Sequence, residues 1–150
     1  MEVPPVLVAS GDGGWLKAMA SQARRPVVGC VGARLLYPPA SPAAGRIQHA
    51  GLLPGLGPGC EHPYRGQPAV TGACLMVRRQ LFQAAGGFEA ALPVEGNDVD
   101  FCLRLGALGF RHVVVPEASL WHAEAASCDP VASSGAYQRC CPLEVPGLSS

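Results

Sequence analysis

The sequence predicts an α/β domain in which helices flank a mixed sheet. Segments with helical periodicity alternate along the chain with short apolar runs bounded by turn residues. The segment 27–37 is apolar almost throughout, which favours a strand covered on both faces of the sheet. The chain has 150 residues, 49% of them hydrophobic, enough for one domain with a substantial core.

The first part of the chain is expected to hold one helix and two or three strands. A brief apolar run at 6–9 comes first. Apolar residues then recur at helical spacing from Trp15, and Pro26 ends this helix. Residues 27–37 are predicted to form a strand, and residues 47–53 a further one.

The second part contains the strongest strand signal, at residues 70–77. Gly72 within it indicates a place where a ligand or another backbone comes close. A short helix is predicted at 78–85, ended by the glycine pair at 86 and 87. A strand is expected at 111–115, with Pro116 as its end.

A longer helix is predicted between these two, from about Asp98 to Leu108. Asn97 is a suitable N-cap and Gly109 a suitable residue for the left-handed exit. One face is expected to be buried. Its central stripe is predicted to be Val99, Cys102, Leu103 and Gly106, widened by Phe101, Leu105 and Leu108.

Composition excludes several classes of function. Eleven basic residues balance 11 acidic ones, so no electrostatic footprint for nucleic acid is present. No apolar run approaches the roughly 18 residues that span a bilayer. The first five residues lack the positive start of a signal peptide. These features predict a cytoplasmic protein, associated with the inner face of a membrane only through partners.

The seven cysteines follow neither a disulfide nor a zinc spacing. Cys30, Cys74 and Cys102 lie in apolar segments, where a reduced cysteine acts as a small hydrophobic residue. Neither Cys60 beside His62 nor the adjacent pair at 140 and 141 gives the paired spacing of a structural zinc site.

Two acidic residues begin the longer helix and are the strongest candidates for chemistry. Asp98 and Asp100 fall in its first turn, where free amides and the helix dipole favour negative charge, and such a carboxylate can act as a general base. Asp100 can pair with Arg104 four residues on, leaving Asp98 to face a cleft. Acidic residues also begin helices for purely structural reasons, so both interpretations stay open here.

His122 follows the last predicted strand. Ligands of open α/β sheets bind at the carboxyl ends of strands, and imidazole is a common ligand of divalent metals. The neighbouring Trp121 could form an apolar wall. A structural role for a lone histidine is the alternative.

Five segments carry a family resemblance when taken in register: Gly14–Leu16 with Val31–Pro38, Gly45–Gly51, Thr71–Arg79 with Gly86–Glu89, Asn97–Arg104, and Trp121–Glu124. Together they resemble the C-terminal half of the family 2 glycosyltransferases, the inverting GT-A enzymes of polysaccharide and cell-envelope synthesis. The resemblance runs from about Gly14 to Ser127.

This resemblance implies a partial GT-A fold, comprising the acceptor-side half, and a transfer reaction with inversion. It makes Asp98 the general base that activates an acceptor hydroxyl, and His122 a ligand of a divalent cation, Mg²⁺ or Mn²⁺, that holds the donor's diphosphate. The other predicted substrate-binding residues are Asn97, where the family often has Glu, together with Gly72, Asp100 and Arg104.

The resemblance leaves little room for a nucleotide-binding half, because only residues 1–14 precede it and they contain no Asp-x-Asp pair. Residues 1–127 are therefore predicted to be a truncated GT-A domain, and residues 128–150 a disordered or non-family tail. The cation and the nucleotide-sugar donor are expected to bind only with a donor half, and the isolated chain is expected not to transfer sugar.

The predicted partners are a nucleotide-sugar donor, a saccharide or lipid-linked acceptor, and a donor half supplied from elsewhere. Self-association through an exposed sheet edge is a further expectation. The alternative function is a non-catalytic remnant or a saccharide-binding or interaction module derived from such an enzyme. The sequence does not distinguish these two classes.

Overall fold

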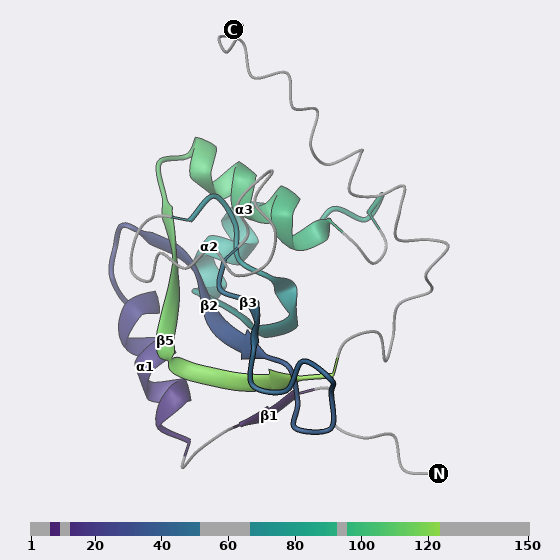
Figure 1. Cartoon of the computed structure of the whole chain (residues 1–150). Helices are drawn as coiled ribbons and strands as arrows, with labels where there is room; N and C mark the ends of the chain where they lie inside the picture. The colour runs from purple at the N-terminus through teal and green to yellow at the C-terminus, as the bar shows by residue number, and fades with distance from the viewer. Residues whose placement is uncertain (1–6, 10–12, 52–66, 93–95, 124–150) are drawn as a thin grey trace, which may run out of the picture.

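A computed structural model describes residues 7–9, 13–51, 67–92 and 96–123, and it confirms a mixed α/β fold of the kind expected for part of a GT-A domain (Figure 1). The elements, in chain order, are β1 (Leu7–Ala9), α1 (Gly14–Ala23), β2 (Val28–Leu36), β3 (Ile47–His49), the 3₁₀ turn η1 (Gly72–Cys74), β4 (Leu75–Val77), α2 (Arg79–Ala84), α3 (Asn97–Ala107) and β5 (Arg111–His122).

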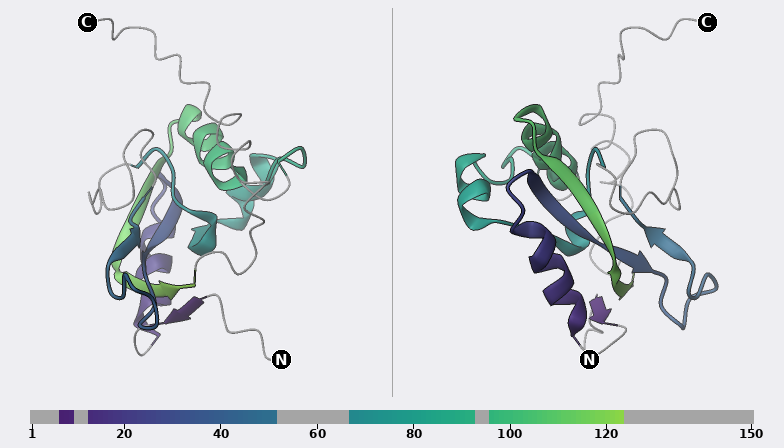
Figure 2. Two further views of the ribbon diagram at one scale, coloured as in Figure 1. Left: turned by 45° about the vertical axis from the view of Figure 1, so that its right-hand side comes forward. Right: turned by 90° about the vertical axis from the view of Figure 1, so that its left-hand side faces the viewer.

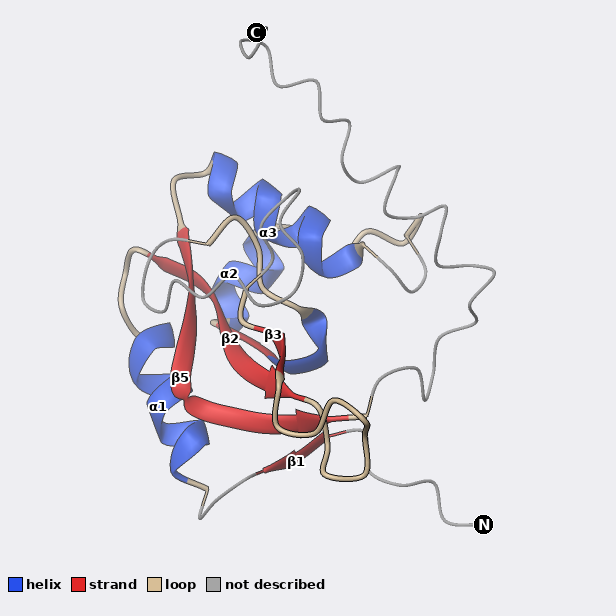
Figure 3. Cartoon of the chain, in the orientation of Figure 1, coloured by secondary structure: helices blue, strands red, loops and turns tan. Residues whose placement is uncertain are grey.

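The sheet is built around β2 and β5, which run parallel (Figure 3). The strand order is β1-β5-β2-β3, and β4 also pairs with β2. Strands β3 and β4 are antiparallel to β2, and β1 is antiparallel to β5. Because β2 and β5 are parallel, their carboxyl ends meet at the same edge of the sheet.

Helices cover both faces of this sheet, as the apolar run at 27–37 predicted (Figure 2). Helix α1 covers one face and α2 with α3 the other. The core on the α1 side consists of Met19, Ala23, Val28, Val31, Ala33, Leu35, Val113, Val115, Ala118 and Leu120. The core on the α3 side consists of Cys30, Ala69, Val70, Val99, Phe101, Cys102, Leu105 and Val114.

Glycines end α2 and α3 as predicted. Gly109 has φ of +90°, its amide donates to Gly106, and the amide of Phe110 donates to Leu105. This is the Schellman arrangement, in which a left-handed residue lets the last carbonyls of a helix find donors. Gly86 and Gly87 end α2 in the same way, with φ of +79° and +69°.

The start of α3 differs from the prediction. Gly96, with φ of +86°, is the N-cap, and Asn97 is the first helical residue. The side-chain amide of Asn97 donates instead to the carbonyl of Leu92. The predicted N-cap therefore joins the helix to the preceding loop rather than closing its first turn.

The buried stripe of α3 is also narrower than predicted. Val99, Phe101, Cys102 and Leu105 are buried, whereas Leu103, Gly106 and Leu108 are exposed. The sheet covers only one side of this helix, so Leu103 and Leu108, on its other side, face solvent in the described part of the chain.

The segment 70–77 is not one continuous strand. Thr71 accepts a hydrogen bond from the amide of Ala73 through its hydroxyl, which closes η1, and only β4 pairs with β2. The prediction of a strand over 70–77 was wrong because a side chain competed locally for the backbone amide.

Strand β5 continues past Pro116, contrary to the prediction that it ends there. The pairing of Ala33 with Val115 is followed by that of Arg34 with Ser119, so three residues bulge away from β2. Proline has no backbone N–H to donate, and because Pro116 lies within the bulge, no hydrogen bond between β5 and β2 is lost. The hydroxyl of Ser119 donates to the Pro116 carbonyl at 2.8 Å, and Arg34 Nε donates to that hydroxyl at 2.9 Å.

Several predictions lie partly or wholly outside the described residues. These include residue 6 of the first apolar run, residues 52–53 of the strand expected at 47–53, and the tail 128–150. On the edge of β5 that faces away from β2, the described residues give two partners: β1 pairs with the end of β5, and Gln67 pairs with His112. Between these two, residues 113–119 have no strand partner on that edge within the described ranges. No helix among the described residues has the length and apolarity to cross a bilayer.

Candidate functional site

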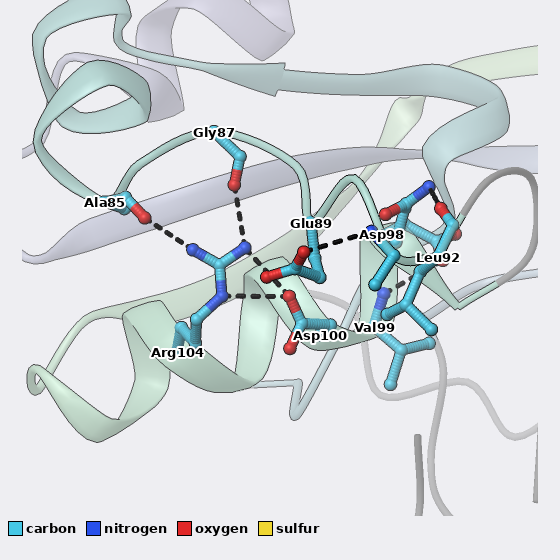
Figure 4. Close-up of polar contacts among 10 residues, drawn as sticks. Ala85, Gly87, Glu89, Leu92, Asp98, Val99, Asp100 and Arg104 are labelled. Carbon is cyan, nitrogen blue, oxygen red and sulfur yellow. Dashed lines mark hydrogen bonds and ion pairs between the residues drawn. The ribbon is translucent and has the colours of Figure 1, made fainter. Parts of the chain in front are cut away.

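Asp98 lies in the first turn of α3, half-buried, with its carboxylate held by two backbone amides. Oδ2 accepts a hydrogen bond from the amide of Gly72 at 2.6 Å, and Oδ1 accepts one from the amide of Val99 at 2.9 Å. A carboxylate oxygen can accept more than one hydrogen bond, so both remain able to meet a substrate hydroxyl. The carboxylate is thus fixed in position at a helix start. Figure 4 shows Asp98 beside Val99 in this first turn.

Gly72 permits this arrangement. The sequence indicated the approach of a ligand or another backbone at this residue, whereas in the structure the side chain of Asp98 comes close. A Cβ built on Gly72 would lie 3.1 Å from the Asp98 Cβ and 3.4 Å from its Oδ2. These separations are tighter than ordinary van der Waals contact, so a larger residue would push against the carboxylate. Whether Gly72 also contacts substrate stays a prediction.

Arg104 joins α3 to the end of α2 (Figure 4). Its guanidinium donates to the carbonyls of Ala85 and Gly87, the latter at 2.7 Å, and it pairs with Asp100 at 2.8 Å. Its Cζ lies 5.4 Å from the ring centroid of Phe101. The predicted pairing of Asp100 with Arg104 is confirmed, and these contacts give both residues a structural task besides any role in acceptor binding.

Asn97 completes the group at the start of α3. Its amide nitrogen donates to Leu92, while its side-chain oxygen is buried and has no hydrogen-bond partner among the described residues. Five of the six predicted site residues therefore cluster at this helix: Gly72, Asn97, Asp98, Asp100 and Arg104.

His122, the sixth predicted residue, belongs to a second group at the carboxyl end of β5. Its Nδ1 lies 2.7 Å from Oε1 of the buried Gln48, and its ring centroid lies 6.5 Å from that of His49. The helix start that carries Asp98 and the end of β5 both face the right-hand side of the molecule in Figure 1. The hydrogen bonds described for Asp98 join it to Gly72 and Val99 rather than to this second group.

Gln48 and His49 were not identified as site residues from the sequence. They lie inside the segment 45–51, which contributed to the family resemblance, but nothing local marks Gln48 as a partner of a residue 74 positions away. Only the pairing of β3 and β5 with the same strand, β2, brings them together.

A buried cluster elsewhere contains three side chains of metal-binding type. The ligand atoms of Cys30, Cys102 and His112 lie within 4.8 Å of one another. His112 Nδ1 accepts from the Cys30 amide at 3.0 Å, which leaves Nε2 to donate to the Cys102 carbonyl at 2.8 Å. Both ring nitrogens are thus engaged by backbone, and the cluster serves as a cross-link between β2, β5 and α3.

The electrostatics of this cluster agree with a structural role. Burial lowers the pKa of His112, so the ring stays neutral at neutral pH. The hydrogen bond with Cys102, together with burial, raises the pKa of the Cys30 thiol. Cys30 and Cys102 are buried and reduced, which confirms the expectation that they act as small hydrophobic residues; Cys74 is only half-buried.

Comparison with known proteins identifies the class. The sequence profile of the family described as glycosyltransferase like family 2 matches residues 61–139, which include Gly72, Asp98 and His122. This match covers more than half of the 150 residues. The chain belongs to glycosyltransferase family 2, as the five segments indicated.

Two relatives align with about three quarters of this chain. The chain is 42% identical over 131 residues to the uncharacterized protein y4gI of Sinorhizobium fredii, covering 75% of this chain and 14% of that protein. It is 37% identical over 134 residues to the O-antigen biosynthesis protein RfbC of Myxococcus xanthus, covering 77% and 10%.

A third relative is the N-acetylglucosaminyl-diphospho-decaprenol L-rhamnosyltransferase of Mycobacterium tuberculosis. It is 38% identical over 72 residues, covering 47% of this chain and 24% of that enzyme. The chain thus spans between about a tenth and a quarter of the length of these relatives. No solved structure matches the chain.

Proposed function

We propose that this chain contributes the acceptor-side part of an inverting glycosyltransferase that moves a sugar from a nucleotide-sugar donor to a saccharide or lipid-linked acceptor. The observation that carries the proposal is the carboxylate of Asp98, held at the start of α3 by the amides of Gly72 and Val99. Family membership and the names of two relatives, in O-antigen synthesis and in rhamnosyl transfer to a lipid-linked sugar, support the reaction class.

Asp98 acts as the general base in this proposal. It removes the proton from an acceptor hydroxyl, whose oxygen forms a bond to the anomeric carbon of the donor. The bond between that carbon and the diphosphate oxygen breaks, and the nucleotide diphosphate leaves with the bonding electrons. A single displacement of this kind inverts the anomeric carbon. Holding the carboxylate by two amides limits its motion, which favours attack in one geometry.

His122 is proposed to be the chain's ligand for a divalent cation, Mg²⁺ or Mn²⁺. Its position at the carboxyl end of β5 fits, because α/β sheets bind ligands at that edge, and so does its Nδ1 contact with an amide oxygen. When bound, the cation would supply positive charge to the leaving diphosphate. The chain's own part is to present the imidazole from a paired strand end.

The test is sugar transfer by the chain together with the donor-binding half of a family member. We expect Asp98→Asn to lower kcat by about 10²–10⁴, the usual contribution of a general base. Glu117→Gln, the same carboxyl-to-amide change at an exposed position on β5, is the matched control and should leave transfer unchanged. Equal activity of the Asp98 variant and the control would remove Asp98 from the mechanism.

A further inference from the structure

Gln48 occupies an unusual position for a polar side chain. It lies in the middle of the three-residue strand β3 and is 1% exposed. Its Oε1 contacts His122 at 2.7 Å, whereas its Nε2 is buried with no hydrogen-bond partner in the described part of the chain. A buried polar group with half of its hydrogen bonds unmade is costly, so its presence calls for an explanation.

The contact crosses the central strand of the sheet. Leu36 of β2 pairs with Ile47 on one side and with Trp121 on the other. Strand β3 is antiparallel to β2, and its register shifts between Leu35 and Leu36, so Gln48 lies in a bulge beside these two residues. His122 follows Trp121 at the end of β5, and the two side chains meet near the carboxyl end of β2. His122 pairs with Leu7 of β1, and the two neighbours of Gln48, Ile47 and His49, pair with β2, which limits how far either side chain can turn away.

The chemistry of the contact sets the tautomer of the imidazole. An amide oxygen only accepts hydrogen bonds, so the ring nitrogen that faces it, Nδ1, carries the proton. The lone pair that a cation requires is then on Nε2. Histidines that bind metals commonly donate their other ring N–H to a carbonyl or carboxylate, which fixes the ring and its tautomer.

We infer that Gln48 is a positioning residue, which holds His122 in the Nδ1-protonated tautomer and thereby directs Nε2 toward the divalent cation. This inference rests on the proposed role of His122. It assigns a task to Gln48, a buried side chain that contacts the ring of His122 from a position 74 residues earlier in the sequence. Gln48 itself touches neither the cation nor the sugar in this scheme.

His112 provides an internal reference for the same measurement. Its Nδ1 accepts from the Cys30 amide and its Nε2 donates to the Cys102 carbonyl, which fixes the opposite tautomer. The structure therefore assigns one buried histidine protonated on Nε2 and one strand-end histidine protonated on Nδ1. Long-range ¹H–¹⁵N correlation of the imidazole rings distinguishes the two forms directly.

The first experiment records these spectra on the full 150-residue chain and on three variants. We expect His122 to be protonated on Nδ1 in the parent chain and in Gln48→Glu, which keeps an accepting oxygen. We expect it to lose that preference in Gln48→Met, which has nearly the same shape but no acceptor. Gln83→Met, the same change at an exposed position on α2, is the matched control and should keep the parent tautomer.

Either of two results would overturn the inference while leaving the proposed function standing: protonation of His122 on Nε2 in the parent chain, or an unchanged tautomer in Gln48→Met. If Gln48→Met does not fold, the parent spectrum and that of Gln48→Glu still decide the assignment. If the amide of Gln48 were turned so that its nitrogen faced the ring, Nδ1 would accept a hydrogen bond and the proton would be on Nε2. The parent spectrum would show this form directly.

The second experiment adds Mn²⁺, up to millimolar concentration, to the parent chain and to Gln48→Met, each joined to the donor-binding half of a family member, because the cation is expected to bind only with that half. Paramagnetic broadening reveals even weak binding. We expect selective broadening of His122 in the parent chain, and an affinity about 10–100-fold weaker in Gln48→Met, the usual effect of losing such a supporting contact. His112 should be much less affected, because it lies at the other end of β5 and paramagnetic broadening falls steeply with distance from the ion. A correct tautomer without broadening of His122 would instead overturn the cation role in the proposed function, and this inference with it.

Discussion

The position of the Asp98 carboxylate depends on the absence of a side chain at Gly72. The Gly72 amide donates to Asp98 at 2.6 Å, a contact that brings the backbone of η1 against the helix start. The sequence placed an acidic residue in the first turn of a helix and a glycine in a segment of strand-like composition. It did not indicate that these two residues, 26 positions apart, form one unit.

At the residue scale, we predict that Gly72→Ala lowers kcat by roughly tenfold, since small displacements of reacting groups cost much in rate. The added Cβ would lie 3.1 Å from the Asp98 Cβ and must displace it. Stability should fall by only about 1 kcal/mol, the ordinary cost of a single substitution. Transfer kinetics and thermal unfolding of the same protein measure the two effects.

The matched control is Gly106→Ala on the exposed side of α3. Its nearest new contact would be His112 Nε2 at 3.8 Å, an ordinary van der Waals distance. Alanine in a helix interior should raise stability by about 0.5–1 kcal/mol and leave kcat unchanged. Equal losses of activity in the two variants would show that Gly72 has no special relation to Asp98.

At the scale of elements, the start of α3 and the end of α2 are one assembly. The glycine pair that ends α2 turns the carbonyls of Ala85 and Gly87 toward Arg104, and Asp100 holds the guanidinium between them. The ring of Phe101 lies under Arg104 and against those of Phe82 and Phe88. Two short helices that are marginal alone thereby fix each other's position.

We predict that Arg104→Met lowers the free energy of unfolding by about 1–3 kcal/mol, as measured by urea denaturation. Most of this should come from the two backbone carbonyls that lose a charged donor. The ion pair with Asp100 contributes less, because both side chains are about one-third exposed, at 36% and 29%. Arg104→Lys should lose an intermediate amount, since a single ammonium cannot span the three acceptors.

Arg111→Met, at an exposed position where β5 begins, is the control for this change and should alter stability by less than about 0.5 kcal/mol. A loss in Arg104→Met no larger than in this control would mean that the contacts of Arg104 add nothing to the docking of α3 on α2.

At the scale of the whole molecule, a buried network joins the central strand pair to α3. His112 of β5 contacts the amide of Cys30 in β2 and the carbonyl of Cys102 in α3. A Cβ on Gly29 would lie 3.0 Å from the His112 ring, so a glycine is needed where the ring crosses β2. The α3 face of the sheet is thus held by polar contacts within an otherwise apolar core.

This network predicts a pH dependence of stability. Burial lowers the pKa of His112 in the folded chain below its usual value of 6.5. The unfolded chain therefore binds more protons between the two pKa values, and stability falls as pH drops below about 6.5. We expect the free energy of unfolding to decrease more between pH 7.5 and 5 in the parent chain than in His112→Gln, which cannot gain a proton.

The other three histidines, His49, His62 and His122, are present in both proteins, so the difference between the two curves isolates His112. Equal slopes would contradict the prediction. If His112→Gln does not fold, an NMR titration of the parent ring gives the same answer, and a pKa at or above 6.5 would count against burial as the controlling effect.

The sequence by itself determined the α/β class, the covered central strand, the glycine exits of α2 and α3, and the candidacy of Asp98 and His122. Each of these depends on residues near one another along the chain or on family motifs. Only the tertiary structure decided that β5 runs past Pro116, that Arg104 spans two helices and that Gln48 meets His122. These outcomes depend on contacts between distant segments, and the free energy of such contacts is not encoded in any local pattern.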